Sequence, residues 1–591
     1  MAEQVIETDV LVIGGGGAGF RAAIAAREKG VRSMLISKGP LARCGATPMA
    51  GADYTLVGRD LKELGHDGDP NDSYEKVFND IVTQGYYLNN QKLIDQYIRT
   101  APQCCKELMD WGIAIRSSEE RAIFTSGTSI MDALLKKARS VGVELLEDRM
   151  IIDLISQGGK VTGALGLDIK TGEFILFKAK SVVIATGGWH KAFWPNTGMR
   201  DLSGEGIAMA HRAGADIGNM EFITFACNIF FDPPKWRGSL APYVLSLVVG
   251  GELTNSLGET FLDAYDPYTV EIGSHMEWNK SFISFASSKE IRDGKGGPNG
   301  GIFYSRGDIP WETMQSQCAV MFPNWKYKAI DFTEWGKKLE ANEPVEVGPA
   351  VEYFDGGIVV NEHFETGVEG LFGAGECILG VFGSNRVFSA ITEMLVQGVD
   401  AGRNAAEYSQ KNKTDEPDSQ LLKSLEEKAI VPLSHNEGPN PAQIRRRIQE
   451  MAQKNLGPIR NQEELSSFVD FLVKVKKEEI PILAVESKSR IYNKEWVDAL
   501  ELKNIVHLLE ASAKSALYRK ESRGVHYRED HPQTDNDNWL EESIVKLIGD
   551  ELEVGKRPLT ITSVTPPKGK RPYLDMLKSM MEAHSDVGGH H

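Results

Sequence analysis

The stretch TDVLVIGGGGAGFRAAIAAREKG, from Thr8 to Gly30, places four consecutive glycines between a β-branched run and an alanine-rich run. The first run is typical of a buried parallel strand, and the second is typical of a helix that ends at Gly30. At their junction, Gly14, Gly16 and Gly19 form the pattern G-x-G-x-x-G. In this context the pattern predicts a dinucleotide clamp, because only glycine lets the backbone turn there and approach a pyrophosphate at the helix N-terminus. A glycine-rich turn without a ligand is the alternative.

Further strands and two changes of composition follow this unit. SMLISK (Ser33–Lys38) completes a βαβ unit, and apolar strands recur at SVVIATGG (Ser181–Gly188) and GLFGAGE (Gly370–Glu376). Between about residues 235 and 350, Trp, Phe, Tyr, Gly and Pro accumulate, which indicates an inserted domain. From about residue 415 the chain is charged with a helical period, which suits a helix bundle.

The composition limits the class of protein. A chain of 591 residues favours two or three domains, and 66 Lys and Arg against 83 Asp and Glu argue against nucleic-acid binding. The six cysteines include no C-x-x-C pair, so we expect no metal or iron–sulfur site and no disulfide framework. The chain shows no basic-then-apolar leader and no run of 18 apolar residues. We therefore expect a cytoplasmic protein that contacts the cytoplasmic side of a membrane only through a partner subunit.

FAD and NAD both bind through such a clamp, and two further motifs favour FAD. ATGG (Ala185–Gly188) and GLFGAGE resemble segments of the flavin-containing members of the two-dinucleotide-binding-domain superfamily. In those proteins the late acidic residue holds the ribityl chain of the flavin. By that resemblance Glu376 is a cofactor residue.

Longer segments extend the likeness over nearly the whole chain. They are NTGMRDLSGEGIAMAHRAGADIGNMEF (196–222), TNSLGETFLDAYDP (254–267), YFDGGIVVNE (353–362) and ALYRKESRGVHYREDHP (516–532). In this order they resemble the flavoprotein subunits of the fumarate reductase and succinate dehydrogenase family. That family also includes L-aspartate oxidase and the α subunit of adenylylsulfate reductase.

The resemblance implies an α/β fold in which an FAD-binding Rossmann-like domain is split by an inserted α+β capping domain and followed by a helical C-terminal domain. The expected boundaries are 1–235 and 351–413 for the FAD-binding domain, 236–350 for the capping domain, 414–566 for the helical domain and 567–591 for a polar, loosely docked tail.

The resemblance also assigns cofactor contacts, all in the glycine-rich turns and the segments quoted above. The predicted FAD-binding residues are Gly14, Gly16, Gly17, Ala18, Gly19, Ser37, Lys38, Cys44, Gly45, Ala46, Thr47, Gly51, Ala185, Thr186, Gly187, Gly188, Asn196, Thr197, Asp201, Glu376, Arg386, Ser389 and Ile391.

The loop after the second strand departs from the respiratory members, in which a histidine there bonds covalently to the flavin. Here the loop reads KGPLARCGATPMAGADY, with Cys44 and Gly45 about where the Ser-His pair would fall. We therefore predict that FAD is held non-covalently. Cys44 either touches the flavin or is a packed small residue.

The substrate residues differ more strongly. Family members clamp fumarate or succinate with histidines and arginines, and here Thr260 stands where the proton-delivering arginine is expected. Ala226 and Glu352 replace two histidines, and Lys280 and Phe285 align with two further arginines. Because an Arg-to-Thr change removes a charge-assisted bidentate contact, we expect fumarate reduction by the family's mechanism to fail.

Three residues remain as candidate catalytic groups: Arg386, Glu352 and Lys280. Arg386, in GSNRVF, lies near the position of a family arginine. Glu352 would donate a proton if an apolar pocket raises its pKa, and Lys280 would do so if its pKa is lowered. Pairing of Glu352 with Arg386 is an equal alternative, and Tyr353 and His190 are further candidates.

Aromatic residues are frequent in segments that border the flavin or the substrate cleft in this family. They are Trp189, Phe193, Trp194, Phe225, Phe230, Phe231, Phe382 and Phe388. Core packing explains about half of them. If the others line the cleft, the substrate is bulkier and less charged than fumarate.

Three functions are compatible with these features. The first is an FAD-dependent oxidoreductase subunit that exchanges electrons between a small organic substrate and a ferredoxin-like iron–sulfur partner subunit. The second is a flavin electron-transfer module that has no organic substrate of its own. The third is sulfur chemistry like that of adenylylsulfate reductase, against which the lack of positive charge in the predicted pocket argues.

Overall fold

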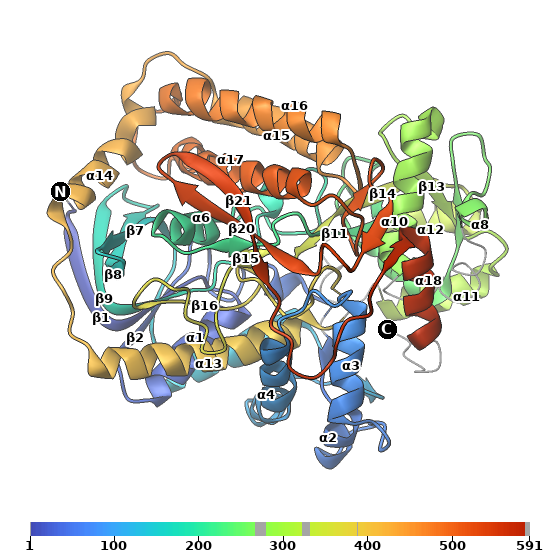
Figure 1. The fold of residues 1–591 in the computed structure, drawn as a ribbon, viewed down its shortest axis with the longest axis horizontal. Helices are drawn as coiled ribbons and strands as arrows, with labels where there is room; N and C mark the ends of the chain where they lie inside the picture. The colour runs from blue at the N-terminus through green and yellow to red at the C-terminus, as the bar shows by residue number, and fades with distance from the viewer. Residues whose placement is uncertain (1, 52, 266–278, 322–330, 387, 585–591) are drawn as a thin grey trace.

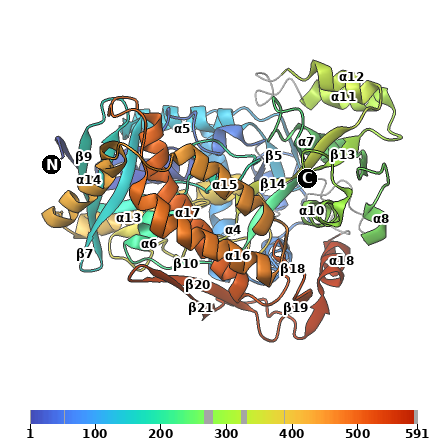
Figure 2. The same ribbon diagram turned by 90° about the horizontal axis from the view of Figure 1, so that it is seen from above.

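The computed structural model describes residues 2–51, 53–265, 279–321, 331–386 and 388–584. Three parts lie along the molecule in Figures 1 and 2: a sheet-containing part that includes the N-terminus, a layer of C-terminal helices beside it, and an inserted part at the opposite end. This arrangement is the α/β fold with a capping domain and a helical C-terminal domain that the sequence predicts.

The central sheet has seven strands in the order β6-β2-β1-β9-β8-β7, with β16 also paired to β9. β1 runs parallel to β2 and β9, as expected for a βαβ unit, and its residues Val10 to Ile13 are buried. The strands are β1 (Gln4–Ile13), β2 (Ser33–Ile36), β6 (Glu144–Leu146), β7 (Arg149–Gln157), β8 (Lys160–Asp168), β9 (Phe174–Ile184) and β16 (Leu371–Gly373).

Helices α1 (Gly17–Glu28) and α13 (Ala390–Lys411) pack closely against each other next to this sheet. Glycines make the close approach possible, since a Cβ at Gly402 would lie 2.2 Å from the carbonyl oxygen of Ala22. The remaining elements of this part are η1 (Thr47–Met49), β3 (Asp53–Thr55), α2 (Gly58–Glu63), α3 (Tyr74–Gln84), α4 (Gln91–Asp110), β4 (Ser117–Glu119), β5 (Ala122–Phe124), α5 (Gly127–Val141), η2 (His190–Ala192) and α6 (Glu205–Arg212).

The inserted part is built on an antiparallel sheet in the order β11-β14-β13-β12. Its core contains Phe230, Trp236, Phe332 and Trp335, whose rings contact one another. The elements are β11 (Ile223–Phe230), α7 (Ala241–Val249), β12 (Glu252–Thr254), α8 (Leu262–Tyr265), α10 (Asn279–Glu290), η3 (Ile291–Lys295), β13 (Ile302–Ser305), α11 (Trp311–Met321), α12 (Thr333–Glu340) and β14 (Val345–Phe354). β14 crosses the boundary proposed at residue 350, so the capping and FAD-binding parts share a continuous strand.

The C-terminal part contains four long helices, of which α17 packs on α15, α16 and α6 (Figure 2). β20 and β21 form a hairpin that the predicted helix bundle does not include, although ESIVKLIGDELEV alternates in polarity around a Gly-Asp turn. The elements are α14 (Ser419–Ser434), α15 (Pro441–Asn455), β17 (Ile459–Arg460), α16 (Gln462–Lys474), η4 (Val475–Glu479), η5 (Ile480–Ile482), α17 (Lys494–Tyr518), β18 (Tyr527–Arg528), β20 (Glu541–Ile548) and β21 (Glu551–Pro558). β20 pairs with β10 (Ile217–Gly218), which also pairs with β15 (Gly357–Ile358).

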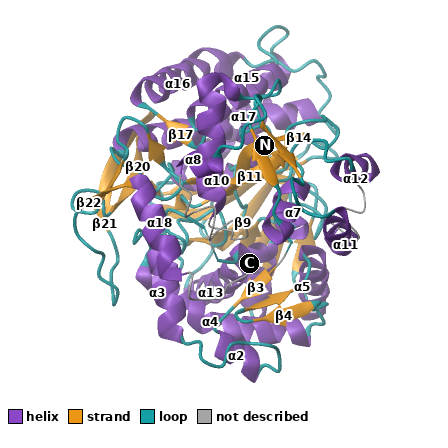
Figure 3. Ribbon diagram, turned by 90° about the vertical axis from the view of Figure 1, so that its right-hand side faces the viewer, coloured by secondary structure: helices purple, strands orange, loops and turns teal. Residues whose placement is uncertain are grey.

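The described part of the tail contains two elements that the sequence did not predict. β22 (Lys570–Pro572) pairs with β19 (Gln533–Asp535), and α18 (Tyr573–His584) lies beside α3 (Figure 3). Tyr573 anchors this helix, because its ring contacts Phe285 of the cap and its hydroxyl donates a hydrogen bond of 2.7 Å to the carbonyl oxygen of Gly524. Among the described helices, none combines the length and the apolar character that a bilayer crossing requires.

Candidate functional site

A cavity of about 580 Å³ opens at the carboxyl ends of β1, β2 and β9 and extends to the cap. This position is where dinucleotides bind in open α/β sheets. Most of the predicted cofactor residues line it. They are Gly14, Gly16, Gly17, Ala18, Ser37, Lys38, Cys44, Gly45, Ala46, Thr47, Gly51, Ala185, Thr186, Gly187, Thr197, Asp201, Glu376, Arg386 and Ile391.

Four predicted cofactor residues lie behind the cavity wall: Gly19, Gly188, Asn196 and Ser389. Gly19 allows α1 to pack on β1, since a Cβ there would lie 1.9 Å from the carbonyl oxygen of Gly14. The Gly188 N–H donates a hydrogen bond of 3.1 Å to Glu376 Oε2. Asn196 donates to a neighbouring backbone carbonyl, and Ser389 caps the N-terminus of α13. These four residues support the wall instead of lining it.

The cavity fits a dinucleotide with a flavin. Helix α1 begins at the cavity without a side-chain cap from Gly16, and the Gly17 N–H donates a hydrogen bond of 3.1 Å to Thr47 Oγ1, another residue of the lining. A helix N-terminus at this place favours an anion. A Cβ at Gly45 or Gly51 would meet no atom within 4 Å, which leaves open space at the loop that lines the cavity. Two buried polar atoms of the lining, Thr186 Oγ1 and His190 Nδ1, have no hydrogen-bond partner among the described residues. A bound cofactor would offer such atoms partners.

The loop after β2 is compatible with non-covalent binding. Cys44 lines the cavity, and its Sγ lies 3.1 Å from Ser37 Oγ. Burial raises the pKa of the Cys44 thiol, so the reactive thiolate is disfavoured. Cys44 therefore fits the role of a packed small residue at the cavity wall.

Lys38, at the end of β2, is held in an ion network that joins the cavity wall to α17. Its Nζ lies 2.6 Å from Glu205 Oε1 and 2.8 Å from Glu501 Oε1. Burial alone would lower the pKa of Lys38, but the two carboxylates raise it. For Glu501 the directions are reversed. Burial alone would raise its pKa, but the charges of Lys38 and Lys191 lower it to about 2. This network, which we call the α17 network, also includes Asp498, whose Oδ1 lies 2.9 Å from Lys191 Nζ.

The three candidate catalytic residues meet at the cap end of the cavity. Glu352 Oε2 lies 3.1 Å from Lys280 Nζ of α10 and 3.1 Å from Arg386 Nη2. Burial alone would raise the pKa of Glu352, but the charges of Lys280 and Arg386 lower it to about 2. The condition set for proton donation by Glu352, a raised pKa, is therefore not met. The pairing of Glu352 with Arg386 is confirmed, and we call these three residues the cap triad.

Further carboxyl groups surround the cap triad, and the sequence analysis missed two of them. Asp355 is buried and accepts a hydrogen bond of 2.8 Å from Thr224 Oγ1, and burial raises its pKa to about 7. Glu393 accepts a hydrogen bond from the hydroxyl of Tyr353, and burial raises its pKa. The segment EYFDGG contained the signal for Asp355, an acidic residue directly after a buried strand.

Three of the replaced family positions, Thr260, Ala226 and Phe285, lie away from the cavity lining. Thr260 is exposed, and Ala226 is fully buried in the core of the cap. Phe285 contacts Tyr527 and Tyr573. These three residues therefore leave no charged group at the cavity.

The eight aromatic residues also lie outside the described lining of the cavity. Trp189 and Phe193 pack on Phe354, Phe230 belongs to the core of the cap, and Trp194 is exposed. The condition under which these rings would indicate a bulkier substrate, that some of them line the cleft, is therefore not met in the described lining. The rings that do line the cavity are Phe124, Tyr243 and Tyr353, next to Leu240 and Val244 of α7.

The loop that carries Arg386 is fixed by segments far away in the chain. The Ser384 N–H donates to the carbonyl oxygen of Gly85 at 3.2 Å, and the Ser384 carbonyl accepts a hydrogen bond of 2.9 Å from the Val525 N–H. Arg523 donates to the carbonyl oxygen of Tyr86 at 2.9 Å and is buried. The two segments therefore hold the Arg386 loop between them.

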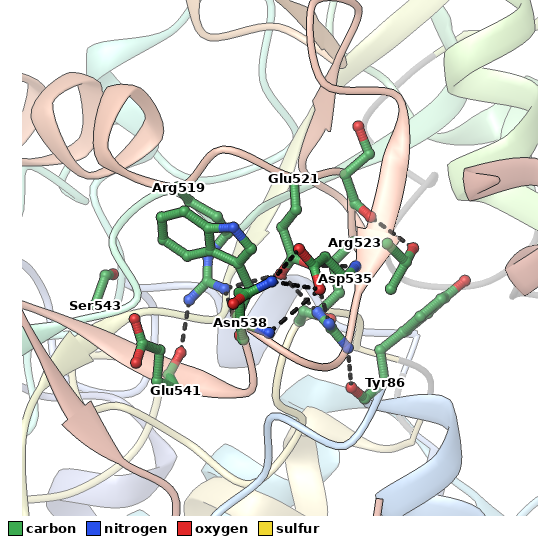
Figure 4. Close-up of polar contacts among 12 residues, drawn as sticks. Tyr86, Arg519, Glu521, Arg523, Asp535, Asn538, Glu541 and Ser543 are labelled. Carbon is green, nitrogen blue, oxygen red and sulfur yellow. Dashed lines mark hydrogen bonds and ion pairs between the residues drawn. The ribbon is translucent and has the colours of Figure 1, made fainter. Parts of the chain in front are cut away.

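Arg523 is itself held by ion pairs in the C-terminal part (Figure 4). Its Nε lies 2.7 Å from Glu521 Oε1, and the same oxygen lies 2.9 Å from Arg519 Nη1. These contacts give Arg523 a structural role. Through Tyr86 they connect the C-terminal part to the turn that supports the Arg386 loop.

This cavity, its glycine clamp and its cap define an FAD-dependent oxidoreductase. The FAD binding domain family matches residues 9–123 and 116–390, and the family described as fumarate reductase flavoprotein C-term matches residues 445–573. The chain belongs to the flavoprotein subunits of the fumarate reductase and succinate dehydrogenase family.

Individual relatives match over nearly their whole length. A fumarate reductase (CoM/CoB) subunit from Methanothermobacter marburgensis is 29% identical over 553 residues, which are 90% of this chain and 96% of that protein. An uncharacterised FAD-dependent oxidoreductase of Methanocaldococcus jannaschii is 30% identical over 565 residues, 92% of this chain and 96% of that protein. Among solved structures, Mycobacterium smegmatis Sdh1 in complex with UQ1 superposes with a TM-score of 0.83 at 28% identity, covering 95% of this chain and 96% of that chain.

Proposed function

We propose that this flavoprotein subunit transfers electrons between an organic substrate other than fumarate or succinate and an iron–sulfur partner subunit, with FAD held non-covalently. The observation that carries this proposal is the cap triad. Its two cations, Lys280 and Arg386, share the carboxylate of Glu352, so a dicarboxylate would have to compete with a buried internal anion.

Different residues of this chain would bind different parts of FAD. The N-terminus of α1 at Gly16 and Gly17 would hold the pyrophosphate, and Glu376 would hold the ribityl chain. FAD, when bound, supplies two-electron transfer at its isoalloxazine ring. Leu240, Tyr243 and Val244 of α7 line the cavity from the cap and would limit access of water to the reacting atoms.

The partner is inferred from the chain's lack of a cluster motif. The six cysteines include no C-x-x-C pair, and the buried Cys227 and Cys377 lie on other elements than the adjacent Cys104 and Cys105 of α4. Electrons that enter or leave the cavity would therefore pass to another subunit. Several relatives are named as subunits of larger enzymes. We place the protein in the cytoplasm, with any membrane contact made through that partner.

The test is anaerobic reoxidation of the dye-reduced holoprotein by a panel of enoates, enoyl thioesters and fumarate. Rapid reoxidation by an enoate or a thioester is the expected result. Reoxidation by none of them would instead favour an electron-transfer module without an organic substrate. Fumarate is included because relatives carry it in their names, and rapid reoxidation by fumarate would contradict the proposal.

Cofactor linkage has a separate test. Acid precipitation of the holoprotein is expected to release all of the flavin into the supernatant, because the loop after β2 offers Cys44 as a buried thiol and contains no histidine. Yellow colour that remains in the washed pellet would contradict non-covalent binding.

A further inference from the structure

Four lysine and arginine side chains line the cavity, and they differ in their partners. Lys38 belongs to the α17 network and Arg386 to the cap triad, so both contact carboxylates. Arg149 Nη2 lies 2.7 Å from Asp168 Oδ2. Arg116 differs from the other three, because it forms no ion pair with any residue that the structure describes. A ligand in the cavity therefore meets one guanidinium that no carboxylate of the described chain occupies.

The hairpin of β4 and β5 fixes the position of Arg116. Arg116 directly precedes β4, and its N–H donates a hydrogen bond of 2.8 Å to the carbonyl oxygen of Phe124 in β5. Its guanidinium donates a hydrogen bond to the carbonyl oxygen of Thr125. In the same sheet Phe124 pairs with Asp53 of β3, and all three of Arg116, Phe124 and Asp53 line the cavity. The guanidinium is therefore attached to a hydrogen-bonded wall of the cavity.

Arg116 lies where the cavity reaches the surface. Arg116 is exposed, as are Ser117 and Glu119 after it in the hairpin. Figure 2 shows β5 and α7 at the junction between the sheet-containing part and the cap. Partial burial lowers the pKa of Arg116, and no charged group contributes to this shift. An arginine in such surroundings stays protonated at neutral pH, so a positive charge marks this end of the cavity.

The cap wall of the cavity is apolar. Leu240 and Val244 are four residues apart and lie on one face of α7, next to Tyr243. These side chains supply no charge, and Phe124 supplies none from the hairpin. Because an apolar wall does not replace the water around a charged group, the part of a substrate that lies against it is expected to be uncharged.

We propose that Arg116 binds an anionic group at the outer end of the substrate, and that the substrate is an enoyl thioester of a phosphate-bearing carrier or its saturated counterpart. The inference rests on the proposed function, in which an organic substrate reacts in this cavity, and it names the class of that substrate. The uncharged acyl thioester would lie against α7. The phosphates would stay at the surface, where a guanidinium can donate two parallel hydrogen bonds to one phosphate.

The test compares two thioesters that differ in their phosphates. Crotonyl-CoA carries phosphates, and crotonyl-pantetheine is the same thioester without them. Each is titrated into the oxidised holoprotein, and binding is followed by the change in flavin absorbance. Arg116→Met should weaken the binding of crotonyl-CoA about fivefold at low ionic strength, and this difference should shrink in about 0.5 M salt. Its binding of crotonyl-pantetheine should equal that of the wild type.

Two further variants keep the test specific. Arg116→Lys keeps the charge but loses the two-pronged donor, so it should restore part of the affinity for crotonyl-CoA. Arg139→Met is the matched control, because Arg139 of α5 is also exposed and forms no ion pair with the described residues, but does not line the cavity. It should bind crotonyl-CoA as the wild type does. Flavin content and Tm are measured for every variant.

Three results would overturn the inference. The first is that Arg116→Met binds crotonyl-CoA as tightly as the wild type. The second is that it loses affinity for both thioesters equally, since the phosphates would then have no part in the effect. The third is that Arg116→Met is purified without flavin, because Arg116 would then belong to the cofactor site.

The outcome is separable from that of the proposed function. If crotonyl-CoA binding depends on Arg116 as described but no organic compound reoxidises the reduced protein, the proposed function fails and the binding site holds. If crotonate or crotonyl-pantetheine reoxidises the protein as fast as crotonyl-CoA does, and Arg116→Met does not alter the binding of crotonyl-CoA, the proposed function holds and this inference fails.

Discussion

Two ion networks lie at different places on the same cavity, and they differ in what they contact. In the α17 network, Lys38 contacts Glu205 and Glu501, and Lys191 contacts Asp498 and Glu501. Asp498 also contacts Arg445 of α15 and Lys494 of α17, so the network joins two helices of the C-terminal part to the cavity wall. In the cap triad, Lys280 and Arg386 both contact Glu352, and Glu352 and Arg386 line the cavity. The first network therefore holds helices in place, whereas the second lies where a ligand would contact it.

The largest effect is expected in the glycine clamp at the other end of the comparison, which holds the cofactor and not the protein's own charged groups. Gly14 has φ +125°, and a Cβ there would lie 2.1 Å from the carbonyl oxygen of Ala185. Gly14→Ala should therefore abolish FAD binding, measured as the flavin content of the purified protein. Gly30→Ala is the control, because Gly30 has φ +85° with no atom within 4 Å of its Cβ. It should cost about 1 kcal/mol of stability and keep FAD. A Gly14→Ala variant that is purified with its full content of flavin would contradict the role of Gly14 in FAD binding.

The α17 network should carry stability. Glu501→Gln leaves two buried lysines short of one carboxylate and should lower the free energy of unfolding by about 3 kcal/mol, measured with denaturant. Glu450→Gln, in an exposed pair with Arg446, should change it by less than about 0.5 kcal/mol. Equal effects of the two substitutions would show that the α17 network is not structural.

The same variant has a pH signature. The pKa of Glu501 in the folded protein is about 2, below its ordinary value of 4.5. Its contribution to stability is therefore present above pH 4.5 and is lost as the pH falls toward 2. The difference in stability between wild type and Glu501→Gln should shrink over this range, measured by unfolding at each pH. A difference in stability between the two proteins that stays constant with pH would contradict the low pKa assigned to Glu501.

Substitution of Arg523 should weaken the contacts that hold the loop of Arg386, a residue of the cap triad. Arg523→Lys keeps the charge beside Glu521 but loses the second branch that donates to the carbonyl oxygen of Tyr86. We expect a loss of about 2 kcal/mol in stability and slower reoxidation of the reduced protein, because the Arg386 loop is less well held. Arg446→Lys is the exposed control. If reduced Arg523→Lys is reoxidised at the wild-type rate, the contacts of Arg523 do not support the cap triad.

The smallest effect is expected at Asp355. Its pKa in the folded protein is about 7, above the ordinary value of 3.8, so the folded state binds the proton more tightly. Stability contributed by this group is present at low pH and decreases as the pH rises from about 3.8 to 7. Asp355→Asn should remove this decrease, seen as a flatter dependence of Tm on pH. If the Tm of Asp355→Asn depends on pH in the same way as the Tm of the wild type, the raised pKa assigned to Asp355 is contradicted.

The sequence predicted the parts of the fold that short-range patterns determine. The clamp at Gly14 and the strand–helix–strand unit around it follow from local backbone requirements, and the capping insertion follows from a change of composition. The hairpin of β20 and β21 was missed because a charged alternating segment was interpreted as part of a helical region. The ordered tail was missed because the burial of Tyr573 depends on Phe285, a residue of the cap.

The site was predicted less completely than the fold. The residues of the cap triad were identified, but the protonation of Glu352 was not, because its pKa depends on two cations from distant segments. The role assigned to the aromatic residues failed because sequence does not show toward which side a buried ring points. The position of Asp355 after a buried strand is visible in the sequence, but the pKa shifts of Asp355 and Glu393 are not, since they arise from burial in the assembled fold.

The most direct measurement is anaerobic stopped-flow reoxidation of the dye-reduced holoprotein by crotonate and by fumarate, each at the same concentration. The structure predicts faster reoxidation by the monocarboxylate, because Glu352 already occupies the two cations of the cap triad. Reoxidation by fumarate as fast as or faster than by crotonate would contradict the account.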